Sequence, residues 1–529
     1  MNGATAPKIP HRGFVTFCTI LATLMQALDS TIANVALPYM QGNLSATSDQ
    51  ITWVLTSYVV AAAIMTSPVG WLSARFGRKN FFILCLTGFT ITSMLCGFAQ
   101  NLPQMVVFRL AQGTFGAALV PLSQSIMLDI YTPEERGSAM AMWGVGVMVG
   151  PILGPTLGGY LTDAFDWRWV FFINLPFGLL AIIGLVLFLN ETKANRALKF
   201  DVVGFAVLSI GIGALQLMLD RGAEQDWFSS TEIIASGIIG LLGLFLFVVH
   251  IATAKAPYIP PRIFKDVNFA SGLLLMFAIG LVLLASSAIL APYVQVMAGY
   301  PVWQAGLLMA PRGLGTMASM MIAGKLASRY DPRKLMAFGI LLLAFTLWDM
   351  SRWTPAIDIP RLTLITVIQG FGLGFVFIPL QVVAFATLAP DLRTDATALF
   401  SLARNVGSAI GISIMSFMLT YNMQLMHTRI GETLTPFNRM MQTGSSYLFW
   451  NVTTFGGRAA LNAEVTRQAL AISYSNDFLL MMWISLPTAL LLFLMQRPKR
   501  PSARQTSLQT QSVTPNSQTQ TAPAHAILD

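Results

Sequence analysis

The chain has 529 residues, of which 55% are apolar and only 10% charged, and its formal net charge is +9. Soluble domains carry about 25% charged residues, so this composition excludes an ordinary soluble protein. Apolar runs of about 20 residues, long enough to cross a bilayer as helix, recur along the chain. They also exclude a β-barrel, whose strands alternate over about 10 residues. The basic residues lie between the runs, which favours a role in membrane topology over nucleic-acid binding.

The apolar runs predict an all-α polytopic membrane protein with 14 transmembrane helices, arranged as two six-helix bundles with two helices inserted between them (6+2+6). The first six are expected near residues 14–37, 51–73, 80–100, 103–128, 138–162 and 169–189. The inserted pair is expected near 201–219 and 232–252. The last six are expected near 269–294, 302–325, 334–351, 361–387, 396–420 and 477–495.

These spans divide the chain into five predicted regions. They are a cytoplasmic N-terminus (1–13), an N-terminal bundle (14–190), a linker with the two extra helices (191–268), a C-terminal bundle with an outer loop at 421–476 (269–495), and a disordered cytoplasmic tail (496–529). Most Lys and Arg residues between spans fall on one side if both termini are cytoplasmic, as the positive-inside rule requires. Cys18, Cys85 and Cys96 all lie in apolar runs and predict no disulfide framework.

The two groups of six spans contain related sequences. GWLSARFGRK at 70–79 recurs as GKLASRYDPRK at 324–334, and Gln112-Gly113 recurs as Gln369-Gly370. Several short matches at nearly one offset indicate a parallel repeat, which is how one large class of transporters is built.

Five motifs in order resemble the major facilitator superfamily, and within it the fourteen-helix drug:proton antiporters of the EmrB type. They are LDSTIANVALP at 28–38, GWLSARFGRK at 70–79, RLAQGTFG at 109–116, GVMVGPILGPTLGG at 146–159 and WRWVFFINLPFG at 167–178. The resemblance covers about residues 14 to 495. It implies two bundles around a central cavity that opens alternately to each side of the membrane.

Asp29 lies deep in the first predicted span, with no basic neighbour in sequence. An ionised carboxylate there costs about 2.5–3.5 kcal/mol, and proton uptake removes that cost. A carboxylate that alternates between charged and neutral forms meets the requirement of proton coupling, and the resemblance assigns the first-span motif such a role. The alternatives are a structural hydrogen-bond acceptor facing a wet cavity, or a binding site for cationic substrates alone.

Three arginines are predicted inside spans. Arg109 cannot realistically lose its proton and must face a partner or a polar cavity. The resemblance assigns Arg109 and Gln112 to proton translocation. The alternative is that Arg109 only ties its helix to a carboxylate. Arg312 and Arg404 are candidates for binding an anionic substrate or for tuning the proton acceptor, with a hydrogen-bonded structural role as the alternative. The second half has Thr366 at the place of Arg109 and apolar residues near Leu283 at the place of Asp29.

Two glycine motifs predict packing and gating. Small residues at every fourth position of the fifth span allow close helix approach, with interleaved prolines relaxing the hydrogen-bond ladder: Gly146, Gly150, Pro151, Gly154, Pro155 and Gly158. This pattern resembles the antiporter motif of exporters. In the loop 70–79, a latch between the halves is predicted for Gly70, Arg75, Gly77 and Arg78, with a simple positive-inside anchor as the alternative. The usual aspartate of this loop is Ala74 here, so a latch must use other contacts.

The sequence therefore predicts a secondary active transporter and not an enzyme, with no cofactor and no metal site. The expected function is proton-driven efflux of hydrophobic or amphipathic toxic compounds across a bacterial inner membrane. The resemblance further implies a tripartite pump, with an EmrA-like periplasmic adaptor and a TolC-like outer-membrane channel. A narrow-substrate carrier, for a siderophore, a fatty acid or another single solute, is the main alternative, and a non-transporting membrane sensor is another. Substrate range, proton stoichiometry and oligomeric state do not follow from the sequence.

Overall fold

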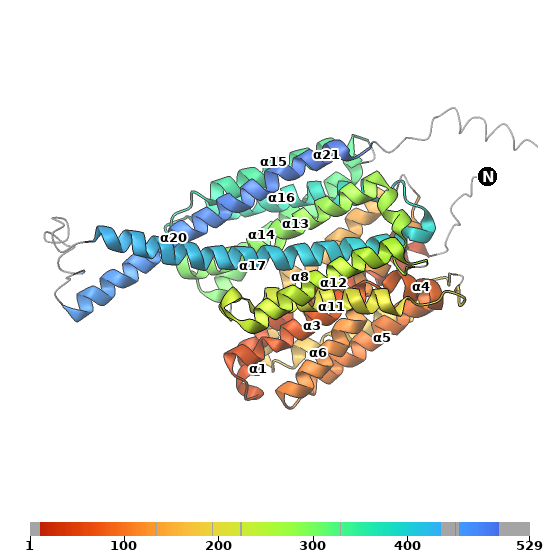
Figure 1. Cartoon of the computed structure of the whole chain (residues 1–529), viewed down its shortest axis with the longest axis horizontal. Helices are drawn as coiled ribbons and strands as arrows, with labels where there is room; N and C mark the ends of the chain where they lie inside the picture. Colours follow the sequence, from red (N-terminus) through yellow and green to blue (C-terminus); the bar gives the residue numbers. More distant parts are fainter. Residues whose placement is uncertain are drawn as a thin grey trace, which may run out of the picture. The chain divides into compact units, whose positions relative to one another are not determined.

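The structure, a computed structural model, describes residues 11–496 apart from 133–134, 193, 223–224, 256, 328, 435–449 and 451–453. It also leaves undescribed the side chains of residues 48, 49, 151, 155, 302, 303 and 390. The predicted cytoplasmic N-terminus (1–13) and the predicted tail (496–529) therefore lie almost wholly outside the described residues, as do the ring contacts of Pro151 and Pro155. Residues 11–496 form one helical unit (Figure 1).

The first half of this unit is a bundle built from ten helical segments. They are α1 (Arg12–Asn43), α2 (Ser48–Ile51), α3 (Trp53–Thr66), α4 (Val69–Phe76), α5 (Arg78–Gly97), α6 (Leu102–Gly116), α7 (Leu119–Ile130), α8 (Arg136–Ala164), α9 (Trp169–Phe172) and α10 (Asn174–Phe188). Helices α3 and α4 meet at a 60° bend. The bend falls at Pro68, which has no N–H to continue the helix.

The second half repeats this arrangement. It contains α13 (Val267–Pro292), which continues into the π-helical turn η3 (Tyr293–Met297), then α14 (Val302–Ala327), α15 (Pro332–Met350), α16 (Ile359–Ala384), α17 (Arg393–Thr433), α20 (Phe455–Ser485), the 3-10 turn η5 (Leu486–Leu490) and α21 (Leu491–Leu494). Helix α13 packs on α17 as α1 packs on α8, and α14 packs on α16 as α3 packs on α6. The sequence repeat therefore corresponds to one packing pattern used twice.

Each of the 14 predicted spans coincides with a helix or a bent pair of helices. Eleven helices of the described residues are long and apolar enough to cross a membrane, or twelve if α3 and α4 form one broken span. The two predicted spans outside that set are α14, which contains Arg312 and Lys325, and α15, which contains Arg333, Lys334 and Asp349. The count of 14 is consistent with the structure and stays a prediction.

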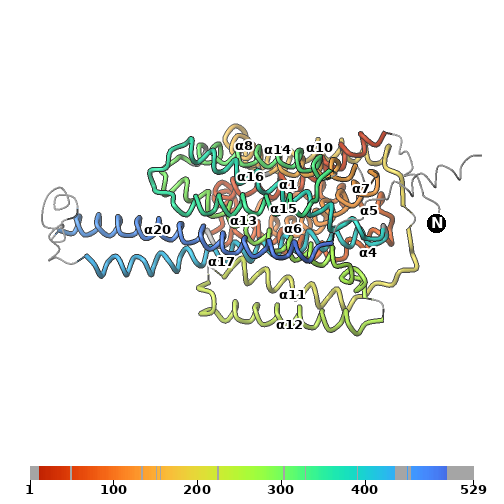
Figure 2. The backbone as a smooth tube through the Cα atoms, turned by 90° about the horizontal axis from the view of Figure 1, so that it is seen from above, coloured from red at the N-terminus to blue at the C-terminus, as the bar shows by residue number. Residues whose placement is uncertain are grey.

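The predicted outer loop at 421–476 needs correction. Helix α17 continues to Thr433 and α20 already begins at Phe455, so the chain there is a helical hairpin with described arms (Figure 2). The prediction ended the spans where hydropathy falls, but polar residues also continue a helix. The ring of His427 and the amide oxygen of Asn462 lie 3.1 Å apart across the two arms.

The inserted pair consists of α11 (Val202–Arg221) and α12 (Thr231–Thr253), joined through the short turn η1 (Trp227–Ser229). Both helices lie outside the two bundles in Figure 2. Helix α11 packs against α3 of the first bundle and α17 of the second, so it covers a seam between them. Helix α12 packs on α11 and exposes Leu241, Phe245 and Val248, as expected of a lipid-facing helix.

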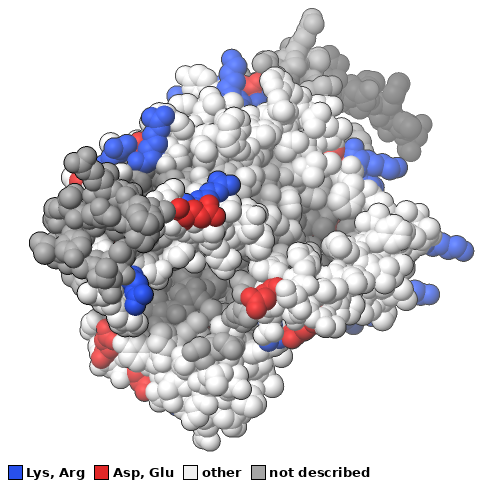
Figure 3. Space-filling view, turned by 60° about the vertical axis from the view of Figure 1, so that its left-hand side comes forward, with Lys and Arg blue, Asp and Glu red and all other residues white. Residues whose placement is uncertain are grey.

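Apolar side chains also cover the outside of the unit. In Figure 3 charged side chains are few and widely separated, and the surface between them is uncharged. Exposed apolar residues such as Leu84 and Ile91 on α5 and Leu341 and Phe345 on α15 continue this surface around both bundles. The surface is suited to lipid, because a soluble protein rarely exposes apolar patches of this extent.

Candidate functional site

A buried polar cluster lies in the middle of the first bundle, between α1, α6 and α10. Nη1 of Arg109 donates to Oδ2 of Asp29 at 2.7 Å and to Oε1 of Gln112 at 2.8 Å. Nε2 of Gln112 donates to Oδ1 of Asp29 at 2.8 Å, and Nδ2 of Asn174 donates to the same oxygen at 3.3 Å. Asp29, Arg109 and Gln112 are all 0% exposed. The structure thus brings together the three residues that the sequence proposed for proton coupling.

Arg109 is held on every side. Its Nε donates to the backbone oxygen of Val54 at 3.0 Å, and its guanidinium lies 4.3 Å from the centre of the Tyr58 ring and 5.7 Å from that of Phe171. Gly113 makes this approach possible, because a Cβ there would lie 2.4 Å from the backbone oxygen of Tyr58. Such a cage stabilises a charge in a dry site through hydrogen bonds and ring contacts together.

The cluster is connected to α8 through the glycine stripe. A Cβ at Gly150 would lie 2.7 Å from the carbonyl carbon of Ala27, and one at Gly154 would lie 2.2 Å from Oγ1 of Thr31. Gly146 and Gly158 similarly face Ile20 and Ile32 of α1. Every described glycine of the stripe therefore packs on α1, on the turns around Asp29. A shift of α1 would therefore change its contacts with α8.

The two bundles are in contact at the end where α1 begins, called here the N-terminal end. Oγ of Ser125 lies 3.0 Å from Oγ1 of Thr394, and Oγ1 of Thr397 donates to the backbone oxygen of Pro121 at 3.0 Å. A Cβ at Gly137 of α8 would lie 2.5 Å from the backbone oxygen of Gly324 of α14. The helix backbones touch here, so the N-terminal end is closed.

Ion pairs of the 70–79 loop strengthen this closed end. Arg78 from the first bundle and Arg393 from the second both pair with Asp129, which lies at the end of α7. Gly70 leaves room for Asp395, since a Cβ there would overlap its carboxylate. Asp129 thus joins the two bundles although the usual loop aspartate is Ala74.

The other two residues of the loop prediction face the segment that follows α10. Nη1 of Arg75 donates to the backbone oxygens of Arg196 and Leu198 at 2.6 and 2.5 Å. Gly77 has a φ of +86°, and a Cβ there would lie 2.5 Å from the carboxylate of Glu191. These residues therefore shape the loop locally, within contacts that do not reach the second bundle.

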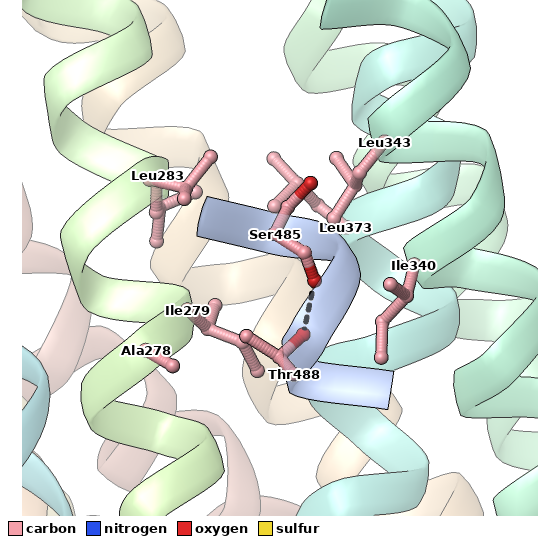
Figure 4. A pocket seen from close by; sticks show the side chains of 9 residues that line it. Ala278, Ile279, Leu283, Ile340, Leu343, Leu373, Ser485 and Thr488 are labelled. Carbon is pink, nitrogen blue, oxygen red and sulfur yellow. Dashed lines mark hydrogen bonds between the residues drawn. The ribbon is translucent and has the colours of Figure 1, made fainter. Parts of the chain in front are cut away.

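Among the residues that the structure describes, the second bundle has no fully buried ion pair that corresponds to Asp29–Arg109. Leu283, at the place of Asp29, lines a small cavity of about 20 Å³ with Leu373, Ser485 and other mostly apolar side chains (Figure 4). The hydroxyls of Ser485 and Thr488 donate to carbonyls of their own helix. The volume would admit a single water, but the polar groups are already engaged. The buried ion pair therefore belongs to one half of a structure whose scaffold repeats.

The two remaining predicted cations lie in the second bundle. Arg312 is 8% exposed; its Nη1 donates to Oγ of Ser287 at 2.7 Å, and its Nη2 donates to Oγ of Ser286 at 3.0 Å and to the backbone oxygen of Leu283 at 3.3 Å. Arg404 on α17 is partly exposed. Among the residues that the structure describes, its guanidinium has no hydrogen-bond partner, and neither arginine is paired with a carboxylate.

Two bundles that repeat one packing pattern, with an ion pair buried in one of them, define a polytopic membrane carrier. A family model described as Major Facilitator Superfamily matches residues 19–412. The chain belongs to this superfamily: it is a multi-pass membrane transporter and not an enzyme.

Curated relatives and solved structures agree with this assignment. The multidrug export protein EmrB of Escherichia coli is 36% identical over 475 residues, 89% of this chain and 92% of that protein. The fatty acid resistance protein FarB of Neisseria gonorrhoeae is 35% identical over 469 residues, 88% of this chain and 92% of that protein. The human organic anion transporter MFSD10 has the same fold, with a TM-score of 0.57 and 17% identity over 90% of this chain and all of that one.

Sequence reasoning missed three residues of the site. Asn174 precedes a Leu-Pro step at the beginning of a span and resembles an ordinary helix start. Asp129 and Arg393 lie in short polar connections, where charged residues are common. Only the repeat offered a signal, since Asn174-Leu-Pro corresponds to Ser485-Leu-Pro in the last span.

Proposed function

We propose that this protein is a proton-driven antiporter that exports hydrophobic or amphipathic toxic compounds across a bacterial inner membrane. The observation that carries the proposal is the buried Asp29–Arg109 pair in one of two otherwise repeated bundles. The high identity to proteins named for multidrug export supports the direction and substrate range. We further propose that the N-terminal end faces the cytoplasm, in agreement with the distribution of Lys and Arg.

The chemistry of coupling follows from the charges of the cluster. With Asp29 ionised, the pair is neutral and each carboxylate oxygen accepts hydrogen bonds. A proton on Asp29 cancels its charge and leaves Arg109 as a buried cation without a counter-ion, which is costly in a dry site. The bundle relieves this cost by rearranging α1 against α6. Because α1 packs on the glycines of α8, and α8 touches α14, the rearrangement reaches the seam between the bundles.

The experiment compares the parent protein with Asp29→Asn in energised everted vesicles at matched expression. Addition of hydrophobic compounds should release protons with the parent and not with the variant, because asparagine cannot carry the proton. Asp163→Asn, an exposed carboxylate, is the matched control and should behave as the parent. Equal responses of Asp29→Asn and parent would make Asp29 structural and refute coupling through it.

The alternative of a narrow-substrate carrier is favoured by one observation, the 35% identity to a protein named for fatty acid resistance. A resistance profile separates the two: protection against many unrelated compounds supports the multidrug function, and protection against one solute supports the alternative. A sensor would bind compounds and move none of them.

The proposal includes a tripartite assembly with an EmrA-like periplasmic adaptor and a TolC-like outer-membrane channel. The resemblance to EmrB-type permeases implies these partners, and the α17–α20 hairpin offers surface outside the bundles for an adaptor. Co-purification from native membranes tests the assembly, with failure to recover either partner after crosslinking as the contradicting result.

A further inference from the structure

The second bundle carries positive charge in its interior that the residues of the structure do not neutralise. Arg312 contacts two hydroxyls and a backbone oxygen, and Arg404 contacts no acceptor among the described side chains and backbone groups. Asp477, a buried carboxylate of the same bundle, accepts no hydrogen bond and pairs with neither arginine. Since an unpaired charge in a membrane-spanning bundle is costly, these two arginines favour a counter-ion from outside the chain.

Both arginines lie against the same face of α13. Nη1 of Arg312 reaches Ser287, and the backbone of Arg404 lies against Gly280, where an added Cβ would be 2.6 Å from its oxygen. Gly280 and Ser287 are seven residues apart, which is nearly two helical turns and about 10 Å along one stripe. The two cations thus approach α13 from two different helices, α14 and α17.

Arg404 lies on a stripe of α17 that contacts the first bundle at its earlier turns and α13 at its later turns, where an added Cβ at Gly411 would lie 2.0 Å from the backbone oxygen of Leu281. Thr397, seven residues earlier on α17 and therefore on the same stripe, donates to the backbone oxygen of Pro121 in the first bundle. Arg404 is partly exposed. Arg312 is next to Gly313, whose added Cβ would lie 2.1 Å from the Ile152 side chain of the first bundle. Arg312 therefore lies on a turn of α14 next to the first bundle, and Arg404 lies on a turn of α17 that packs on α13.

We propose that Arg404, supported by Arg312, forms a binding subsite for the anionic group of amphipathic substrates. The two arginines have different roles. The two serines of α13 position Arg312, while the hydrogen-bond donors of Arg404 are free to bind a carboxylate, sulfonate or similar group. In the first bundle the buried carboxylate of Asp29 is neutralised by Arg109 or by a proton. An interior with this balance attracts amphipathic anions and repels amphipathic cations.

This inference rests on the proposed export function and specifies its substrate class. The test uses tetraphenylborate and tetraphenylphosphonium, two ions of nearly the same size and shape and of opposite charge. Their binding to the purified full-length protein in nanodiscs is measured for the parent, Arg404→Gln, Arg404→Lys and Arg429→Gln. Comparisons are made between variants for one probe at a time, so that the different lipid partitioning of the two ions cancels.

Loss of a charge close to the bound anion should weaken tetraphenylborate binding by at least about tenfold in Arg404→Gln. Tetraphenylphosphonium binding should stay the same or strengthen. Arg404→Lys should retain most of the affinity for the anion, because it keeps the charge. Arg429→Gln removes an exposed charge from the outer part of the same helix and should change neither affinity.

The proposal is overturned if Arg404→Gln weakens both ions equally, which indicates a structural role, or weakens neither. Arg312→Gln is measured second, since loss of its three hydrogen bonds can disturb folding; a folded Arg312→Gln with unchanged anion affinity refutes the supporting role. Transport of both ions is followed separately in proteoliposomes. If no compound of a broad panel is moved while anion binding still depends on Arg404, the export function fails and the subsite stands.

Discussion

A close backbone contact between the bundles predicts how the N-terminal end opens. A Cβ at Gly324 would lie 2.6 Å from the backbone oxygen of Gly137 and 2.7 Å from Cβ of Ala141, whereas ordinary contact begins at 3.4 Å. Gly324→Ala therefore forces α8 and α14 apart by roughly 0.8 Å. Overpacking of this kind costs about 1–3 kcal/mol, which lowers the population of the closed end about 5- to 150-fold relative to the open one.

Gly306→Ala is the matched control, because it lies on the same helix and its Cβ would meet nothing within 4 Å. Both substitutions gain the same helix propensity of about 0.5–1 kcal/mol, so their difference isolates the contact. Spin labels at the exposed positions Asn80 and Lys334 of the N-terminal end, on a cysteine-free background, report the separation by pulsed electron resonance. Gly324→Ala should add a longer distance that the parent and Gly306→Ala lack. Identical distributions for the two variants would show that this contact does not hold the end closed.

Three further predictions follow from the contacts described. Asp129→Asn removes the shared partner of Arg78 and Arg393. The same spin-label pair should then shift toward the longer distance, because the equilibrium between the closed and the open end changes by roughly 1–3 kcal/mol. The control Asp166→Asn, whose pair with Arg168 stays within one bundle, should leave the distances unchanged. Asn174→Ala removes a hydrogen-bond donor from Asp29 and Ser93 and should destabilise the protein by about 1–3 kcal/mol in thermal unfolding. An unchanged melting temperature would contradict this and would show that water replaces the lost bonds. Burial raises the pKa of Asp201, but hydrogen bonds from the Gly204 N–H and from His250 outweigh it, so the pKa lies below its ordinary value. The melting temperature of Asp201→Asn should therefore fall below that of the parent at neutral pH, and the difference should shrink as the pH falls below about 4; a difference independent of pH would contradict this.

The fold was largely predictable because each span is a long apolar run, and the motifs indicated the repeat. The ion pair was only half predictable: Asp29 and Arg109 each stood out as charges inside spans, but their pairing depends on how the bundle places α1 and α6 in space. Asn174 and Asp129 were missed because an amide at a helix start and an acid in a short connection are common in any membrane protein. The helical hairpin was missed for another reason. Hydropathy indicates which part of a helix can lie in the bilayer, but it does not indicate where the helix ends.

The placement of α11 makes the two lateral approaches to the interior unequal. One seam between the bundles, at α3 and α17, is covered by α11, and Oγ of Ser413 on α17 is bonded to the backbone oxygen of Leu219 on α11. The opposite seam is a direct contact of α8 with α14, in which Gly137 and Gly324 leave no room for an added Cβ. The two sides of the carrier therefore differ toward the lipid: a separate helix covers one seam, and the two bundles close the other by their own contact.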